Sequence, residues 1–231
     1  MIRWIFLDLD DTILDFKGGE ANAIRKTLSH VGLEPTDALI ARYSAINMAQ
    51  WEALERGELT REQVHVRRFE LLFREVGSVA SPEEASDYYM SALAAEHSYL
   101  PGGRELLDAL YGNYLLYLAS NGTLSVQKPR IADSGVGRYF EAMFISEEVG
   151  AVKPTKAFFD VCFASIPDFR KEDAVILGDS LTSDILGGIR AGIRTCWFNS
   201  KGKAGRKDIS PDAEIRDLAQ FPLLLEEWNR E

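Results

Sequence analysis

The chain alternates between short apolar runs and longer stretches in which apolar residues recur at helical spacing. The apolar runs with the length of a buried strand are residues 2–9, 114–119, 142–145, 174–177 and 193–198. Helical stretches separate the later runs, which is the pattern of right-handed β-α-β units. We therefore expect an α/β fold with a doubly wound parallel sheet, Rossmann-like, at its core. A last short strand is expected near residues 213–215, with a helix after it over 218–228.

Residues 20–96 differ from the rest of the chain. Apolar residues recur there at helical spacing, and no run resembles a strand. Glycine- and proline-containing breaks at residues 32–35, Gly57 and 77–82 divide the segment into about four helices. This pattern predicts an all-helical insert in the α/β domain.

Glycine-rich segments flank the insert at residues 16–19 and 100–103, and both are typical of hinges. The sequence therefore predicts a core made of residues 1–15 and 99–231, interrupted by a helical cap over residues 16–98.

Composition and charge narrow the functional classes. The 231 residues are 46% hydrophobic with ordinary glycine and proline content, which excludes disordered and collagen-like chains. A formal net charge of −10 argues against a nucleic acid polymer or an anionic membrane as partner. With two cysteines in apolar stretches and no apolar run long enough to span a bilayer, we expect a cytoplasmic protein that is a monomer or weak homodimer.

Polar side chains directly follow the apolar runs. Asp8 and Asp10 end the first run, Ser120 and Asn121 follow the second, and Asp179 follows the fourth. Ligands of parallel α/β sheets bind beyond the carboxyl ends of the strands, so these side chains are expected to meet at one edge.

The chemistry of these side chains favours phosphoryl transfer. Two carboxylates 4 Å apart repel by about 4 kcal/mol at an effective dielectric constant of 20, so a cation is needed to keep them ionised. Asp8, Asp10, Asp179 and Asp184 together suit a hard divalent cation such as Mg²⁺. Lys153 would supply a positive charge for an anionic oxygen. The sequence therefore predicts a small phosphorylated metabolite as the substrate.

Each fragment alone also has an ordinary interpretation: Asp-x-Asp occurs in turns, Ser-Asn-Gly is a common turn, and Lys-Pro often precedes a helix. In their order here, however, they resemble the motifs of the haloacid dehalogenase-like hydrolases, a family of mostly Mg²⁺-dependent phosphatases. The segments that carry the resemblance are Asp8-Leu9-Asp10-Asp11-Thr12, Ser120-Asn121-Gly122, Lys153-Pro154 and Gly178-Asp179-Ser180-Leu181-Thr182-Ser183-Asp184.

The resemblance implies a role for each of these positions. Asp8 would be the nucleophile that forms an aspartyl-phosphate, and Asp10 the acid that protonates the leaving oxygen and then activates water. Phosphate would be held by Ser120, Asn121 and Lys153, and Mg²⁺ by Asp8, the Asp10 carbonyl and Asp179. Thr12 would support the loop, and Asp184 would orient the metal's water molecules and Lys153.

The second acid favours a phosphatase, since the dehalogenases of the family lack it and need no metal. Residues 144–154 and 183–189 are similar to the noncanonical pyrimidine 5′-nucleotidases, which implies a nucleoside 5′-monophosphate as substrate. Pro129 departs from what that resemblance implies: it is harmless in the first turn of a helix and disruptive further in.

Substrate choice is expected to lie in the cap, because the catalytic loops contact phosphate and metal. The candidates are Phe16, Asn47, Trp51 and Arg68. A ring such as that of Trp51 could stack on a base. The alternative interpretation is that Trp51 and Phe69 are core residues and that Arg68 is a solvated charge.

Three functions are therefore weighed. The leading hypothesis is a Mg²⁺-dependent 5′-nucleotidase. The alternatives are a phosphatase for sugar phosphates or phosphoglycolate, or a phosphomutase, and a non-enzymatic binding module, which the complete set of motif residues disfavours.

Overall fold

The computed structural model describes residues 1–230 and builds them around one parallel sheet. Its six strands are β1 (Trp4–Leu7), β2 (Leu115–Ser120), β3 (Ala142–Ile145), β4 (Ala174–Gly178), β5 (Arg194–Phe198) and β6 (Ala213–Ile215). They lie in the order β3-β2-β1-β4-β5-β6, with every neighbouring pair parallel. The first strand, β1, therefore lies near the centre of the sheet, and the later strands are added on both sides of it. This order confirms the expected doubly wound α/β fold.

The helices of the described residues form two groups, α1 to α4 between β1 and residue 98 and the others after them. Their bounds are α1 (Phe16–His30), α2 (Asp37–Glu55), α3 (Arg61–Val76), α4 (Pro82–Ala94), α5 (Gly103–Leu110), α6 (Leu124–Ser134), α7 (Ser146–Val149), α8 (Lys156–Ala164), α9 (Leu186–Ala191) and α10 (Gln220–Trp228).

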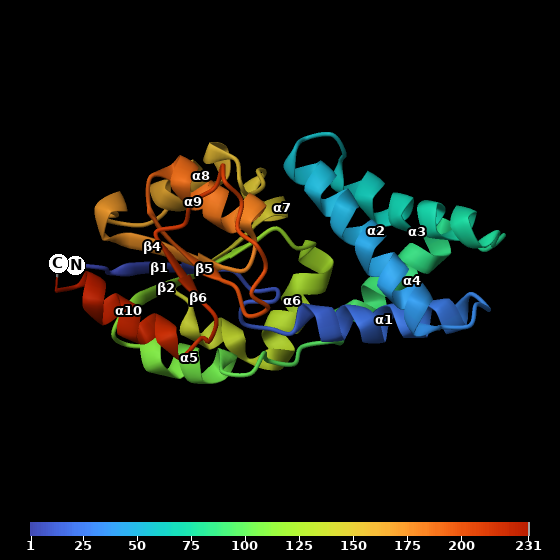
Figure 1. The fold of residues 1–231 in the computed structure, drawn as a ribbon, viewed down its shortest axis with the longest axis horizontal. Coiled ribbons are helices and arrows are strands. Elements are labelled where there is room, and N and C mark those ends of the chain that lie inside the picture. Colours follow the sequence, from blue (N-terminus) through green and yellow to red (C-terminus); the bar gives the residue numbers. More distant parts are fainter. Residues whose placement is uncertain (231) are drawn as a thin grey trace.

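Both faces of the sheet are covered because successive side chains of a strand point to opposite faces. In β1, Ile5 and Leu7 join the apolar cluster that α5 and α10 complete. Trp4 and Phe6 join a second cluster with the phenylalanines of α8. Figure 1 shows the consequence: α8 and α9 lie above the sheet, and α5 and α10 lie below it.

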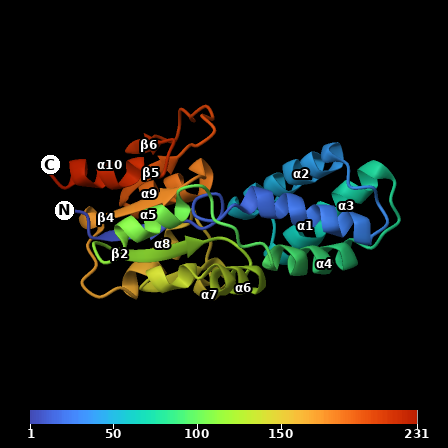
Figure 2. The ribbon, with the colours of Figure 1, turned by 90° about the horizontal axis from the view of Figure 1, so that it is seen from below.

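Helices α1 to α4 pack against one another in a four-helix bundle beside the sheet (Figures 1 and 2). Their apolar faces meet around Tyr43, Phe69 and Tyr89, all fully buried. Thr60 starts α3 with a reciprocal cap in which its side chain accepts from the Gln63 amide and the Gln63 side chain accepts from the Thr60 amide. The number of helices agrees with the sequence pattern, while the domain division at residues 16 and 98 stays a prediction.

The first glycine-rich segment belongs to a helix. Gly18 and Gly19 lie in the first turn of α1, where the Asp15 side chain accepts a hydrogen bond from the Gly18 amide at 2.9 Å. A Cβ on Gly19 would lie 2.9 Å from the Cβ of Glu96, so glycine allows the two linkers to approach each other closely. These glycines permit close packing, and a hinge at residues 16–19 stays a prediction.

The structure also places Phe69, the two cysteines and Pro129. Phe69, Cys162 and Cys196 are buried, and both thiols are free. Helix α6 begins at Leu124, which places Pro129 in its second turn rather than its first. Among residues 1–230, no helix combines the length and the apolar character needed to cross a bilayer.

Candidate active site

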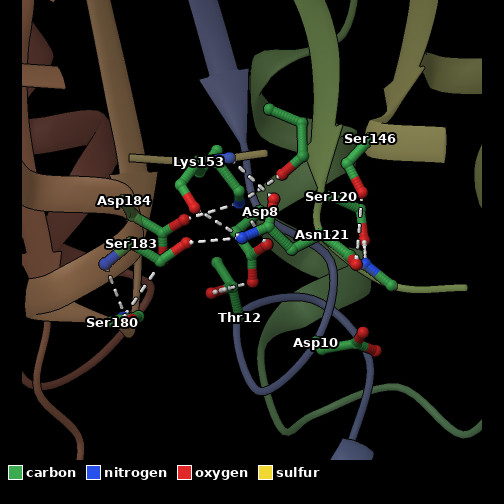
Figure 3. A network of polar contacts seen from close by, with 12 residues as sticks. Asp8, Asp10, Thr12, Ser120, Asn121, Ser146, Lys153, Ser180, Ser183 and Asp184 are labelled. Atoms are coloured by element: carbon green, nitrogen blue, oxygen red, sulfur yellow. Dashed lines mark hydrogen bonds and ion pairs between the residues drawn. The ribbon is translucent and has the colours of Figure 1, made fainter. Parts of the chain in front are cut away.

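Four loops meet at the carboxyl edge of the sheet, beside the bundle. Asp8 follows β1, Ser120 ends β2, Lys153 lies beyond α7, and Asp184 lies in a single turn of π-helix after β4. Figure 3 shows Asp8 and Asp184 directed at the ammonium group of Lys153, with Ser120 and Asn121 beside this group. The structure thus brings together residues that are up to 176 positions apart, as Asp8 and Asp184 show.

Lys153 is the centre of this network. Its side chain is 1% exposed, and its Nζ donates to Asp8 Oδ1 at 2.8 Å, to Asp184 Oδ1 at 2.6 Å and to the Ala119 carbonyl at 2.6 Å. All three ammonium protons therefore have acceptors. Burial lowers the pKa of Lys153, but the two carboxylates outweigh burial and raise this pKa above its ordinary value. The amine is a permanent positive charge.

Asp8 is almost fully buried, and its second oxygen accepts a long hydrogen bond from Thr12 Oγ1 at 3.4 Å. Burial raises the pKa of Asp8 well above its usual range, and Lys153 opposes this rise. A divalent cation beside Asp8 would favour the ionised form, and a carboxylate held against Lys153 and away from water is suited to attack an electrophile.

Carboxylate oxygens of Asp8, Asp179 and Asp184 all lie within 4.8 Å of one another. Burial, together with Asp184 and Asp11, raises the pKa of Asp179 to about 7. These acids carry more negative charge than Lys153 alone offsets, and their oxygens are hard ligands. The donor set fits a divalent cation that keeps several water molecules, such as Mg²⁺.

The Asn121 side chain is engaged with the main chain of Lys153. Its amide donates to the Lys153 carbonyl and accepts from the Lys153 amide, both at 2.8 Å. It also donates to Ser183 Oγ at 3.2 Å. Asn121 therefore fixes the position of Lys153, a role that the sequence did not indicate.

Ser120 keeps a donor available. Its Oγ accepts hydrogen bonds from the Gly122 amide at 3.0 Å and from Gln127 Nε2 at 2.8 Å. Because both contacts use lone pairs, the hydroxyl proton can be donated to an anionic oxygen in the cavity.

Asp10 lies apart from the Lys153 network, as Figure 3 shows. Its carboxylate accepts from Arg130 Nη1 at 2.5 Å and from Gln127 Nε2 at 2.7 Å. Both partners come from α6, and the sequence analysis named neither. Three residues apart on a helix, they share one face.

A cavity of about 820 Å³ extends from these loops to the bundle, and Phe16, Asn47, Trp51 and Arg68 all line it. The interpretation of Arg68 as a solvated charge is wrong: the side chain is 1% exposed and donates to Asn47 Oδ1 at 3.0 Å. Its guanidinium also lies 4.4 Å from the ring centre of Tyr89. Amide and aromatic partners, which a linear sequence cannot pair, make this burial possible.

The bundle contacts the catalytic loops through residues that the sequence analysis did not select. Arg61 of α3 donates to the Asn121 carbonyl at 2.7 Å and to Ser146 Oγ at 2.5 Å. Glu55 of α2 accepts from Thr182 Oγ1 at 2.9 Å, and burial raises the pKa of Glu55 to about 7.

His65 of α3 makes a further contact across this boundary, to Thr123 Oγ1 at 2.8 Å. Burial and the nearby charges of Arg68 and Arg61 lower the pKa of His65 to about 4. The ring is therefore neutral at pH 7, and its position between the bundle and the Ser120 loop is structural rather than acid-base.

Known proteins similar to this chain share its motifs' family. The family model described as haloacid dehalogenase-like hydrolase matches residues 5–198. The HAD-hydrolase YfnB of Bacillus subtilis (strain 168) is 38% identical, with 95% of this chain and 93% of YfnB covered. A crystal structure of YfnB bound to magnesium aligns with a TM-score of 0.93 over 97% of this chain and 98% of that one.

Two further relatives have a stated activity. The pyrimidine 5′-nucleotidase PynA of Streptococcus pneumoniae (strain ATCC BAA-255 / R6) is 34% identical, with 92% of this chain and 90% of PynA covered. The pyrimidine 5′-nucleotidase YjjG of Escherichia coli (strain K12) is 30% identical, with 96% and 97% covered.

Proposed function

The chain belongs to the haloacid dehalogenase-like hydrolases, and on that basis we propose that it is a Mg²⁺-dependent phosphatase that hydrolyses nucleoside 5′-monophosphates. The observation that carries the proposal is the buried Asp8 carboxylate, held at 2.8 Å by Lys153 and within 4.8 Å of Asp179 and Asp184. This arrangement places a nucleophile, a cation that attracts phosphate and a site for a divalent cation at the carboxyl edge of the sheet.

Asp8 would act first. One of its oxygens attacks the phosphorus, the bond from phosphorus to the ester oxygen breaks, and an aspartyl-phosphate forms. Asp10 enters this step as the carboxylic acid and gives its proton to the leaving oxygen, so a neutral alcohol departs and Asp10 is left as the carboxylate. Lys153 stabilises negative charge on the phosphoryl oxygens throughout, and the Ser120 hydroxyl donates to one of them.

In the second step Asp10 acts as a general base. Its carboxylate takes a proton from a water molecule, whose oxygen attacks the phosphorus and breaks the bond to Asp8. Inorganic phosphate leaves, and Asp8 is regenerated.

Asp8, the Asp10 carbonyl and Asp179 would hold Mg²⁺, with Asp184 beside them. When bound, Mg²⁺ lets one anion approach another by neutralising charge between carboxylate and phosphate. The crystal structure of YfnB bound to magnesium supports Mg²⁺ as the cation.

The nucleotide assignment rests on the two relatives named pyrimidine 5′-nucleotidase and on the shape of the site. The cavity continues from the catalytic loops past Trp51 to the buried pair of Asn47 and Arg68. In this proposal the base and sugar of the nucleotide occupy this part of the cavity.

The test is a phosphate-release screen with Mg²⁺ over nucleoside monophosphates and sugar phosphates, comparing kcat/KM. A preference for nucleotides, lost in the Asp8→Asn variant and with EDTA, supports the proposal. A preference for sugar phosphates or phosphoglycolate would favour the second enzyme class, and isomerised sugar would indicate a mutase. Full activity of Asp8→Asn would refute the nucleophile assignment.

A further inference from the structure

Arg130 is one of the largest fully buried side chains in the described structure, with 1% of its surface exposed. Burying a guanidinium is costly unless a carboxylate accompanies it. Within residues 1–230, the carboxylate in ion-pair contact with Arg130 is that of Asp10, at 2.5 Å from Nη1. The positive charge of buried Arg130 therefore lies against the Asp10 carboxylate.

Gln127 binds the other oxygen of the same carboxylate. Its Nε2 donates to Asp10 Oδ2 at 2.7 Å and to Ser120 Oγ at 2.8 Å, while its Oε1 accepts from Arg130 Nη1 at 2.8 Å. Both Asp10 oxygens are thus held from one face of α6, and the same face reaches the serine that we propose binds phosphate.

Arg130 also contacts both linkers between the sheet and the bundle. Its Nε donates to the Glu96 carbonyl at 2.8 Å, and its guanidinium lies 5.8 Å from the ring centre of Phe16. Phe16 is the first residue of α1, where the first linker enters the bundle, and Glu96 lies on the second linker, so Arg130 is fixed on several sides.

The remaining nitrogen of Arg130, Nη2, is buried without a hydrogen-bond partner in the described residues. An unpaired buried donor is destabilising, and a site selected for packing alone would favour an apolar side chain. Arg130 and Gln127 both line the cavity that holds the catalytic loops. These facts favour a role in the reaction over a role in stability.

We propose that Arg130 and Gln127 are positioning residues that fix the Asp10 carboxylate in the orientation from which it exchanges protons with the leaving oxygen and with water. The inference rests on the proposed function of Asp10. Because a proton must pass between atoms at hydrogen-bond distance, a carboxylate that rotates freely loses most of its catalytic contribution.

The kinetic test uses leaving groups that differ in their need for a proton. For cytidine 5′-monophosphate, whose alcohol must be protonated, Arg130→Met is expected to lower kcat by about 10- to 100-fold, with KM changed little. For p-nitrophenyl phosphate, p-nitrophenolate leaves without protonation. Its single-turnover release with enzyme in excess should stay within about 3-fold of wild type.

Two variants serve as references. Asp10→Asn must show the same selective loss, and it tests the premise about Asp10. Lys128→Met lies on the same helix with an exposed ion pair to Glu148, and it should match wild type with both substrates. Equal losses with both substrates, or unchanged kcat in Arg130→Met while Asp10→Asn shows the selective loss, would overturn the positioning role alone.

A structural measurement keeps the inference testable whatever the activity. In a crystal structure of Arg130→Met, the Asp10 side chain should leave its present orientation or become disordered. If the protein folds poorly, Gln127→Met, which leaves the Arg130 pair intact, provides the second variant and should free Asp10 Oδ2. An Asp10 carboxylate that stays in place in both variants would contradict the proposal.

Discussion

The ammonium group of Lys153 donates hydrogen bonds to two buried carboxylates, those of Asp8 and Asp184. Its loss would leave both carboxylates without this cation. Exposed lysines in the same chain show the contrast. Lys156 pairs with Asp160 at 2.6 Å, but its side chain is 62% exposed. The same residue type and the same partner type therefore differ in energy through burial alone.

Lys153→Met is expected to lower the free energy of unfolding by about 3–5 kcal/mol at neutral pH, because it leaves Asp8 and Asp184 buried without their cation. The matched change Lys156→Met should lower it by less than about 0.5 kcal/mol. Urea unfolding of both variants measures the difference. Equal, small losses would show that the Lys153 network contributes little to stability.

His65 gives a pH-dependent contribution to stability. Its pKa is about 4 in the folded protein, against about 6.5 in an unfolded chain. Between these values the unfolded chain binds more protons, so stability falls as pH falls from 6.5 to 4. Because the ring is partly exposed, the total is about 1–2 kcal/mol.

We expect His65→Gln to reduce this acid-side loss, visible in unfolding free energies measured at a series of pH values. A ¹H–¹³C NMR titration of the His65 ring measures the pKa directly. A midpoint near the unfolded value would contradict the burial argument.

Among the helices, α9 can lie close to the sheet because two of its residues are glycines, which have no side chain. A Cβ on Gly188 would lie 2.6 Å from methyl carbons of Ile176 in β4 and Thr195 in β5. A Cβ on Gly187 would lie 2.7 Å from the ring of Phe159. The glycine pair lets α9 lie close to β4, and so sets the position of the loop that carries Asp184.

Gly188→Ala is therefore expected to destabilise the fold by about 1–2 kcal/mol, since overpacking outweighs the better helix propensity of alanine. The neighbouring change Ile189→Ala, at a side chain that is 43% exposed, should change stability by less than about 0.5 kcal/mol. Thermal unfolding of the two variants measures the difference. A Gly188→Ala protein as stable as wild type would show that α9 can move away from the sheet.

At the scale of the whole molecule, the sheet and its catalytic edge could be predicted from the sequence. Buried parallel strands appear as continuous apolar runs, and the acids that follow them stand at fixed places, as Asp8 after β1 shows. Ser120, which ends β2, and Asp179, which follows β4, are found at that edge for the same reason, whereas Lys153 reaches it from a loop beyond α7.

The rest depended on contacts that no local pattern carries. The sequence around Arg68 indicates an exposed charge, because its partner Asn47 lies 21 residues away on another helix. Gln127 and Arg130 form an ordinary helical pattern, and only the path of the linkers brings Asp10 against them, 117 and 120 residues away. The monomeric or weakly dimeric state and the cytoplasmic location stay predictions.

The central claim is that Asp8 carries the phosphoryl group. The most direct measurement is mass spectrometry of the acid-quenched Asp10→Asn protein during turnover of p-nitrophenyl phosphate with Mg²⁺, since this variant should form the intermediate and hydrolyse it slowly. The peptide that contains Asp8 should carry one added phosphoryl group at that residue. Release of p-nitrophenolate with no phosphoryl group on Asp8 at any quench time would contradict the account.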